Sequence, residues 1–357
     1  MAAAATKHSI TVPLLTGPRD SETVRTLASG AVLLAPVIAA VSALLMVPVY
    51  FITSLHSTAT ILICTLPVAA ALDILRATAF KLRKGSTAAM IDGTWLLTQV
   101  AISLSLTTQI QTAWSMTLAW SLGAIFAVVG GMILLKLYPA PAALRTAWGT
   151  VRPVGASLAT DRLLVDARVQ AAPLLLAAVA GMAATGALRA GLTLVGPINA
   201  VIAGLTPLIT MWVAERLHAP AQARRVIIAW GLAIVALGAA CGLFVIGIPI
   251  EWGRAAMGAA WNPARELIVP LGIYIALQGF VAAGGIVLRA AHQTIRLVRY
   301  RLSVETVSLT APIIGVLLGS TKGAAYGFAV AAAVSAAISA RVAYEYLSTA
   351  QEGAVKD

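Results

Sequence analysis

The residues best suited to chemistry lie inside long apolar runs of the chain. Asp73 and Arg76 stand three positions apart within one such run, so on a helix they share a face. At about 1.5 Å of rise per residue, Asp73 would lie about 12 Å from Lys81, where the run ends. A charged side chain that deep in a bilayer costs at least about 2.5 kcal/mol on insertion scales. We therefore expect the two residues either to neutralise each other for structure alone or to face a water-filled binding cavity.

Charged residues near the ends of apolar runs form a second group of candidates. Arg83 and Lys84 follow the run that holds Arg76, and Arg289 ends a later one. Guanidinium groups bind phosphate through paired hydrogen bonds, so these residues could receive a lipid diphosphate. The alternative is that they only orient the helices and attract anionic lipids. A third group of charges of alternating sign consists of Asp161, Arg162, Asp166 and Arg168. Such a pattern is typical of a solvated helix end whose charges pair with one another. The alternative is a gate at the inner mouth of the protein.

Patterns typical of enzymes are missing from the sequence. It contains no GxxxxGK[ST] loop for ATP, no HExxH and no recognisable Ser/His/Asp set, and its few acidic residues are scattered. We therefore predict that the chain is not an enzyme and needs no cofactor or metal. The cysteines and histidines form no metal-ligand spacing, and we interpret the cysteines as small buried apolar residues; these are Cys64, Cys241, His8, His56, His218 and His292.

The elements that must position these candidates are membrane-spanning helices. Of the 357 residues 60% are apolar and 11% are charged, whereas a soluble domain has roughly 25% charged residues. A soluble chain of this length could not cover so much apolar surface, but a bilayer can. The net charge of +12 is spread over short clusters rather than one stripe, which argues against nucleic acid as a partner. The first 25 residues lack the apolar core of a signal peptide, and residues such as 16–20 read as a flexible polar lead.

Each bilayer crossing needs about 20 apolar residues, which predicts an all-α bundle of about ten helices. Basic residues support this count, because 20 of the 25 fall on one side of the membrane when the loops alternate, with both termini cytoplasmic. The turn between the fifth and sixth spans is placed near Gly186 and Arg189. The predicted spans are 27–51, 58–80, 88–108, 113–136, 169–187, 190–213, 226–249, 267–288, 302–320 and 323–345.

The longest cytoplasmic connection, 137–168, divides the chain into two lobes. Its apolar residues, among them Trp148, alternate with arginines and suggest an amphipathic helix along the membrane surface. The lobes are weakly repeated, because Arg25, Pro67 and Arg83 have counterparts 200 to 206 positions later in Arg225, Pro270 and Arg289. The predicted parts are a cytoplasmic lead (1–26), a four-helix lobe (27–136), the linker (137–168), a six-helix lobe (169–345) and a cytoplasmic tail (346–357).

Prolines and glycines within the spans suggest where helices bend or pack. Proline removes a helical hydrogen bond, so such sites are candidate hinges in a transporter, although membrane helices also tolerate proline without any such role. Glycines at 315, 319, 323 and 327 recur every four residues, which lets backbones approach closely. The hinge candidates are Pro36, Pro48, Gly196, Pro197 and Pro207.

Three stretches carry a resemblance to a known family. The first runs from Leu72 through Arg76 and the basic turn before Gly85 to Asp92 and Trp95. The others are 187–197, which includes Ala187-Leu188-Arg189-Ala190, and 284–290, Gly-Gly-Ile-Val-Leu-Arg-Ala. Together they resemble the Wzx-like flippases of polysaccharides and lipid-linked oligosaccharides, in the multidrug/oligosaccharidyl-lipid/polysaccharide exporter superfamily. Members have twelve helices in two six-helix lobes, so this chain lacks the equivalent of the first two.

The resemblance implies a multi-pass protein of the bacterial plasma membrane that moves a lipid-linked sugar to the outer leaflet by alternating access. Its partners would be the lipid bilayer, the lipid-linked saccharide and enzymes of envelope-polysaccharide synthesis. Alternatives are a cation-coupled multidrug extruder of the same superfamily, a membrane-embedded envelope enzyme, and a non-transporting scaffold or decayed paralogue. The implied cavity residues are Asp73, Arg76, Arg83, Lys84, Asp92, Arg189 and Arg289.

Overall fold

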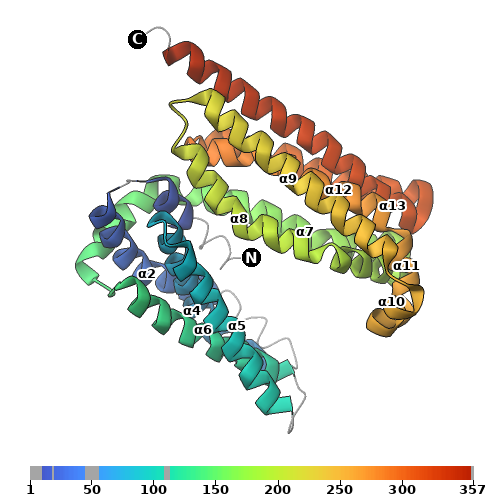
Figure 1. Ribbon diagram of the computed structural model, residues 1–357, viewed down its shortest axis with the longest axis horizontal. Coiled ribbons are helices and arrows are strands. Elements are labelled where there is room, and N and C mark those ends of the chain that lie inside the picture. The colour runs from blue at the N-terminus through green and yellow to red at the C-terminus, as the bar shows by residue number, and fades with distance from the viewer. Residues whose placement is uncertain (1–9, 18–19, 45–55, 108–112, 355–357) are drawn as a thin grey trace. The chain divides into compact units, whose positions relative to one another are not determined.

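A computed structural model describes residues 10–17, 20–44, 56–107 and 113–354 (Figure 1). Every regular element among these residues is a helix, which confirms the predicted all-α class. Residues 10–16 form a first short helix, here called the N-terminal helix. The others are α2 (Ser21–Leu44), α4 (His56–Lys81), α5 (Gly85–Thr107), α6 (Ala113–Leu135), η1 (Pro141–Ala143), α7 (Leu144–Leu194), α8 (Gly196–Ala214), α9 (Pro220–Gly247), α10 (Ile250–Met257), η2 (Gly258–Ala260), α11 (Trp261–Glu266), α12 (Ile268–Ala290) and α13 (Thr294–Ala354).

The lengths of the helices fit a multi-pass membrane protein. In the described part of the chain, seven segments are long and apolar enough to cross a membrane. Two of them, Pro141–Leu194 and Thr294–Thr349, have 54 and 56 residues, far more than the roughly 20 that one crossing needs. The predicted spans 58–80 and 88–108 correspond to α4 and α5, which are not among the seven. The polytopic bundle is confirmed, while ten crossings stay a prediction.

The chain forms two compact units, residues 1–163 and 164–357, and the boundary falls inside α7. The amphipathic helix expected in the linker and the span expected to follow it are one helix rather than two. This helix is interrupted at Gly181, whose φ of 83° is accessible to glycine at little cost. Val151 and Leu158 are buried and Trp148 is exposed, and the amphipathic membrane-surface helix stays a prediction.

The turn predicted near Gly186 and Arg189 is also wrong. Both residues lie within helical backbone, and the breaks occur at Gly181 and at Val195. Gly196 and Pro197 begin α8 rather than interrupt a span, because proline in the first turn of a helix loses no hydrogen bond. Pro36 and Pro207 lie inside α2 and α8, as expected of kink sites, and Pro48 lies outside the described residues.

In the first unit, α4 packs against α2, α5 and α6, and α5 packs against α6. The N-terminal helix belongs to this unit, since Ile10 and Leu15 are buried. The Lys81 ammonium donates hydrogen bonds to the carbonyls of Leu15 (2.8 Å) and Gly17 (2.9 Å), which lie at the C-terminal end of that helix. The prediction of a flexible polar lead is therefore wrong for residues 10–17, because the apolar residues before Thr16 have a packing surface on the helices that follow.

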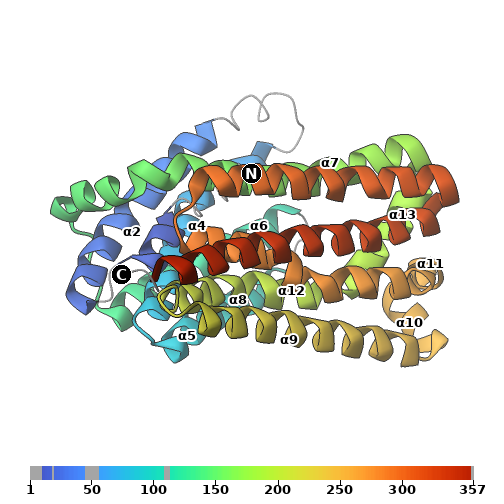
Figure 2. The same ribbon diagram turned by 90° about the horizontal axis from the view of Figure 1, so that it is seen from above.

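In the second unit, α12 lies between α9 and α13, and α8 packs against both α9 and α12 (Figure 2). Glycines allow the close crossing of α9 and α12, because a Cβ atom at Gly238 would lie 2.8 Å from the Cα of Ala276. The cluster where these helices meet α13 consists of apolar side chains, including Ile227, Trp230, Ile286 and Leu347. Burial of such side chains holds the helices side by side.

Helix α13 consists of two arms joined at Gly319 and Ser320, where the backbone leaves the helical region. The arms are antiparallel neighbours, because Gly315 lies against Gly323 and Gly327 against Ala311, with no room for a Cβ atom at these glycines. The predicted division between spans 302–320 and 323–345 is confirmed. Gly319 has a different role from the one expected, since it lies at the turn and a Cβ atom there would meet nothing.

The two units share one turn in detail. After α4, Arg83 has φ 57° and its backbone N–H donates to the carbonyl of Phe80, while the backbone N–H of Lys84 donates to the carbonyl of Ala79. After α12, His292 has φ 54°, and it and Gln293 donate to the carbonyls of Arg289 and Leu288 in the same pattern. Each turn is a Schellman motif that ends one helix and leads into the next. Aligning the turn after α4 with the turn after α12 gives an offset of 209, the difference between 292 and 83, compared with 206 for the expected pairing of Arg83 with Arg289.

Candidate functional site

The sequence candidates Asp73, Arg76 and Asp92 meet in the first unit. Arg76 Nη1 lies 3.5 Å from an oxygen of Asp73 on the same helix, and Arg76 Nε lies 3.1 Å from Asp92 Oδ1 on α5. The side chains of Asp73, Arg76 and Asp92 are 17%, 26% and 41% exposed. The group thus joins two carboxylates to one guanidinium at the contact of α4 and α5. The sequence indicated the pair on one helix, whereas the ion pair across helices required the fold.

Trp95, the last residue of the same motif, holds α5 against the next helix. Its indole Nε1 donates to the carbonyl of Trp120 at 3.2 Å, and the two indole rings lie 5.6 Å apart between centroids. A Cβ atom at Gly123 would lie 2.9 Å from the Trp95 ring, so glycine makes room for this contact. Two residues of α5 three positions apart therefore contact two different helices, because Asp92 pairs with Arg76 of α4 and Trp95 contacts Trp120 of α6.

The remaining candidates do not join this group in the described structure. Arg83 and Lys84 are exposed at the turn after α4, and Arg83 lies seven residues, or about 10 Å along the helix, beyond Arg76. Arg189 is exposed on α7 beside Leu188, which packs against Leu267 and Leu271 at the start of α12. Arg289 lies at the opposite end of α12. The sequence candidates thus occupy at least three separate places.

Arg289 belongs to a buried polar cluster of the second unit. Arg289 and Arg301 are each 7% exposed, and Glu305 is 8% exposed. One Glu305 oxygen accepts a hydrogen bond from Arg168 Nε, and the other lies 3.4 Å from Arg301 Nη1. A Cβ atom at Gly285 would lie 2.8 Å from Arg289 Nη2 and 3.1 Å from Arg301 Nη2, so both guanidinium groups lie over this glycine. We call these four charged residues the arginine cluster.

A network of hydroxyl groups lies next to the arginine cluster. The Tyr300 and Ser339 hydroxyls lie 2.6 Å apart, and both lie within hydrogen-bonding distance of the Val281 carbonyl, at 2.7 and 2.8 Å. The guanidinium of Arg301 also lies 5.5 Å from the centroid of the Tyr300 ring. A Cβ atom at Gly284 would lie 2.9 Å from that ring. The glycine pair 284–285 therefore gives room first to Tyr300 and then to the arginines.

The offset of 209 relates the two polar groups. It pairs Arg76 with Gly285 and Asp92 with Arg301. In the first unit, α4 supplies Arg76 and the following helix, α5, supplies Asp92. In the second unit, α12 supplies Gly285, and the following helix, α13, supplies Arg301, which lies over that glycine. The charge at equivalent positions is thus inverted between Asp92 and Arg301.

Sequence reasoning missed most of the arginine cluster. Arg168 was considered only as part of a helix end or a gate, and Arg301 only as a topological charge. Glu305 lies in an apolar run four residues after Arg301, the same kind of signal that identified Asp73 and Arg76. A search for opposite charges one helical turn apart would therefore have found this pair, but not the contact with Arg168, which lies 137 residues away in sequence.

Comparisons with known proteins identify the fold. No protein-family model and no curated protein sequence matches the chain. Among solved structures, an outward-facing multidrug resistance MATE family transporter of the MOP superfamily matches 98% of this chain and 85% of its own, with a TM-score of 0.81 and 11% identity. A MOP superfamily transporter from Pyrococcus furiosus matches the same shares with a TM-score of 0.80 and 12% identity.

A eukaryotic MATE transporter matches 99% of this chain and 87% of its own, with a TM-score of 0.80 and 15% identity. The chain therefore has the fold of the MATE transporters of the MOP superfamily. This is a fold of the kind that the resemblance in the sequence motifs implies. These neighbours are transporters rather than enzymes, and they belong to a different branch from the flippases.

Proposed function

We propose that this chain is a membrane transporter that moves a lipid-linked oligosaccharide or polysaccharide precursor across the bacterial plasma membrane. The observation that carries the proposal is the arginine cluster, in a buried part of the second unit, where Arg168 and Arg301 pair with Glu305 and the guanidinium of Arg289 lies with that of Arg301 over Gly285. Charged groups within a membrane protein are functional by default, because a bilayer makes them costly. Guanidinium is also the side-chain group whose geometry best matches phosphate.

The substrate class follows from the sign of the charge. A lipid-linked sugar carries its negative charge on a phosphate or diphosphate between the sugar and the lipid. In this proposal, Arg289 and Arg301 hold that group, while the lipid tail stays in the bilayer. The resemblance to Wzx-like flippases supports the same substrate, and enzymes of envelope-polysaccharide synthesis would supply it. Alternating access of the two units would then expose the headgroup to each side in turn.

One neighbour supports the use of charge as a guide within this fold. The Pyrococcus furiosus transporter is described as having a binding pocket of reverse polarity that suggests a different function. Charge can therefore separate members that share the fold. In this chain, the inversion between Asp92 and Arg301 gives the second unit the basic character.

A flipping assay with purified protein tests the proposal. The protein is reconstituted into vesicles with a fluorescent lipid-linked oligosaccharide, and an impermeant quencher reports the rate at which label reaches the outer leaflet. We expect Arg289→Gln and Arg301→Gln each to slow flipping by at least about tenfold, because each removes charge-assisted hydrogen bonds. The double variant Arg145→Gln/Arg152→Gln is the control, since both residues are exposed in the first unit.

The second candidate function is extrusion of multiple drugs coupled to a cation. Two of the structural neighbours favour it, because one is a multidrug resistance MATE transporter and the other a eukaryotic MATE transporter. In that case Asp73 and Asp92, on either side of Arg76, are the acids that would exchange a cation. Efflux of ethidium from the same vesicles under a sodium or proton gradient separates the two. Ethidium efflux without flipping contradicts the first proposal, and flipping without efflux contradicts the second.

A further inference from the structure

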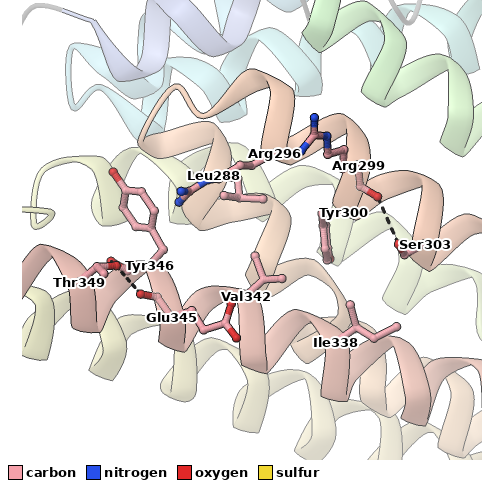
Figure 3. Close-up of a pocket in the computed structure, with 10 residues that line it drawn as sticks. All are labelled: Leu288, Arg296, Arg299, Tyr300, Ser303, Ile338, Val342, Glu345, Tyr346 and Thr349. Carbon is pink, nitrogen blue, oxygen red and sulfur yellow. Dashed lines mark hydrogen bonds between the residues drawn. The ribbon is translucent and has the colours of Figure 1, made fainter.

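The second unit has an open cleft between the two arms of α13, next to the end of α12 (Figure 3). Its volume is about 470 Å³. The first arm contributes Arg296, Arg299 and Ser303, and the second contributes Ile338, Val342 and Tyr346. One wall is therefore basic and the other mainly apolar. None of these six residues belongs to the arginine cluster, and Tyr300, whose ring lies beside the Arg301 guanidinium, also lines the cleft.

The cleft has an excess of positive charge. Arg296 and Arg299 are exposed and form no ion pair with any residue in the described ranges. Glu345 also lines the cleft and would repel an anion, but one of its oxygens lies 2.7 Å from Arg341 Nε. Because Arg341 neutralises that carboxylate, the two lining arginines determine the sign of the site. An anionic ligand fits it.

The position of the cleft along α13 matches the headgroup layer of a bilayer. Arg296 and Arg299 follow the turn at His292 by four and seven residues, or about 6 and 10 Å. The charge pattern of the loops predicts that this turn is cytoplasmic. Polar headgroup layers are several ångströms thick on each side of a hydrocarbon core of about 30 Å. Arginines at this depth can therefore reach lipid phosphates while Ile338 and Val342 contact a chain.

We infer that this cleft binds an anionic phospholipid of the cytoplasmic leaflet. Arg296 and Arg299 hold the phosphate, the Tyr346 hydroxyl and Ser303 offer polar contacts beside it, and an acyl chain lies against Ile338 and Val342. The occupant is a resident lipid of the bilayer, and the inference does not depend on what the protein transports. A free phosphate ester has the same headgroup chemistry, so the experiment must separate the two sources.

Native mass spectrometry of the purified protein tests the site. The detergent-solubilised protein is titrated with phosphatidylglycerol and, separately, with phosphatidylcholine of the same chain length. We expect tighter binding of phosphatidylglycerol to the wild type. Arg296→Gln/Arg299→Gln should weaken it about 30-fold, because a basic side chain near the membrane surface contributes about 1 kcal/mol. Arg296→Lys/Arg299→Lys should retain most of the preference, which shows that the charge rather than a folding defect is responsible.

The control variant Arg145→Gln/Arg152→Gln makes the same change of charge in the first unit and should bind as the wild type does. Equal binding of the two lipids by the wild type, or unchanged binding by Arg296→Gln/Arg299→Gln, overturns the inference. Displacement of phosphatidylglycerol by equimolar glycerol phosphate identifies a free anion as the ligand instead. Displacement by a lipid-linked oligosaccharide, with flipping lost in Arg296→Gln/Arg299→Gln, makes the cleft a substrate site and also overturns it.

Discussion

Asp92 and Arg301 occupy equivalent positions in the two halves of the chain, one acidic and the other basic. Asp92 binds Arg76 of the preceding helix, α4. Arg301 instead lies over Gly285 of the preceding helix, α12, at the position equivalent to Arg76. The backbone turn before each residue is the same, so the difference lies in the side chains alone. A repeated fold has therefore produced a mixed-charge group in one unit and a mainly basic one in the other.

The ion pairs of Arg76 should respond to single and double replacement in opposite ways. Arg76→Gln leaves Asp73 and Asp92 close together without their cation, so we expect a loss of about 2 kcal/mol in the free energy of unfolding. This is below the ~3–5 kcal/mol of a fully buried broken pair, because these side chains are partly exposed. Arg76→Gln/Asp92→Asn should recover most of the loss. The thermal unfolding midpoint in detergent measures both.

The same variants test whether Arg76 also binds substrate. If it does, flipping stays lost in the double variant although stability returns, and Arg76→Lys restores only part of the rate because an ammonium lacks the planar fork. A fully active Arg76→Gln/Asp92→Asn protein would mean that Arg76 serves the structure only.

The adjacent glycines 284 and 285 should separate stability from transport. Gly285→Ala meets the flexible ends of Arg289 and Arg301, which can shift, so we expect slower flipping with an almost unchanged unfolding midpoint. Gly284→Ala meets the Tyr300 ring and the Cα of Ser339, which cannot move as easily. Overpacking of this kind costs about 1–3 kcal/mol, so this variant should unfold earlier. Equal effects of the two replacements on both measurements would contradict this assignment.

Within α13, Gly315 and Gly319 give a matched pair for the hairpin. Gly315→Ala would place a Cβ atom against the carbonyl oxygen of Gly323 and force the arms apart, which we expect to lower the free energy of unfolding by about 1–3 kcal/mol. Gly319→Ala lies in open space and serves as the control. Unfolding midpoints of the purified variants measure the difference. Loss of stability in Gly319→Ala alone would reverse these roles.

The sequence predicted the features that depend on local pattern. Apolar runs and loop charges indicated the helical bundle, and the glycines at 315, 319, 323 and 327 indicated the close approach of backbones. Features that depend on partners distant in sequence were missed. The contact of Arg168 with Glu305 and the docking of residues 10–16 are of this kind, because no local period records which helix lies opposite. The turn near Gly186 was misplaced because Gly181, not the charged Arg189, has the positive φ.

At the start of α2, Asp20 should make stability depend on pH in the acid range. The pKa of Asp20 is lowered first by the Thr23 side-chain hydroxyl and then by the backbone N–H groups of Thr23 (2.7 Å) and Glu22 (3.2 Å), all of which donate hydrogen bonds to its carboxylate. A lowered pKa in the folded state contributes stability above the unfolded pKa, and this contribution is lost as pH falls through the folded pKa. Asp20→Asn keeps a capping oxygen but cannot titrate.

The difference between wild type and Asp20→Asn in unfolding midpoint should therefore be constant near neutral pH. As the pH falls through the acid range, the unfolding midpoint of the wild type should decrease relative to that of Asp20→Asn. A difference that does not change with pH would show that the hydrogen bonds of Asp20 do not contribute through its charge.

The predicted topology is tested by single cysteines in a protein whose two native cysteines have been replaced. Cysteines at His56 and Trp252, and at Gln111 outside the described residues, should react with an impermeant reagent added to intact cells. Those at Gly85, His218 and His292 should be protected, because they lie in turns predicted to be cytoplasmic. Labelling at Gly85 together with protection at His56 would invert the orientation.

The two hydrogen bonds from Lys81 to Leu15 and Gly17 imply that the N-terminal helix packs into the first unit after α4 has been synthesised. The N-terminal helix leaves the ribosome before its neighbours, yet it packs beside Ala147 and Val151 and is held by a side chain of α4. It can reach its place only after all of these residues have been synthesised. Residues 10–17 are thus synthesised before α4 and α7, but they can join the first unit only after both.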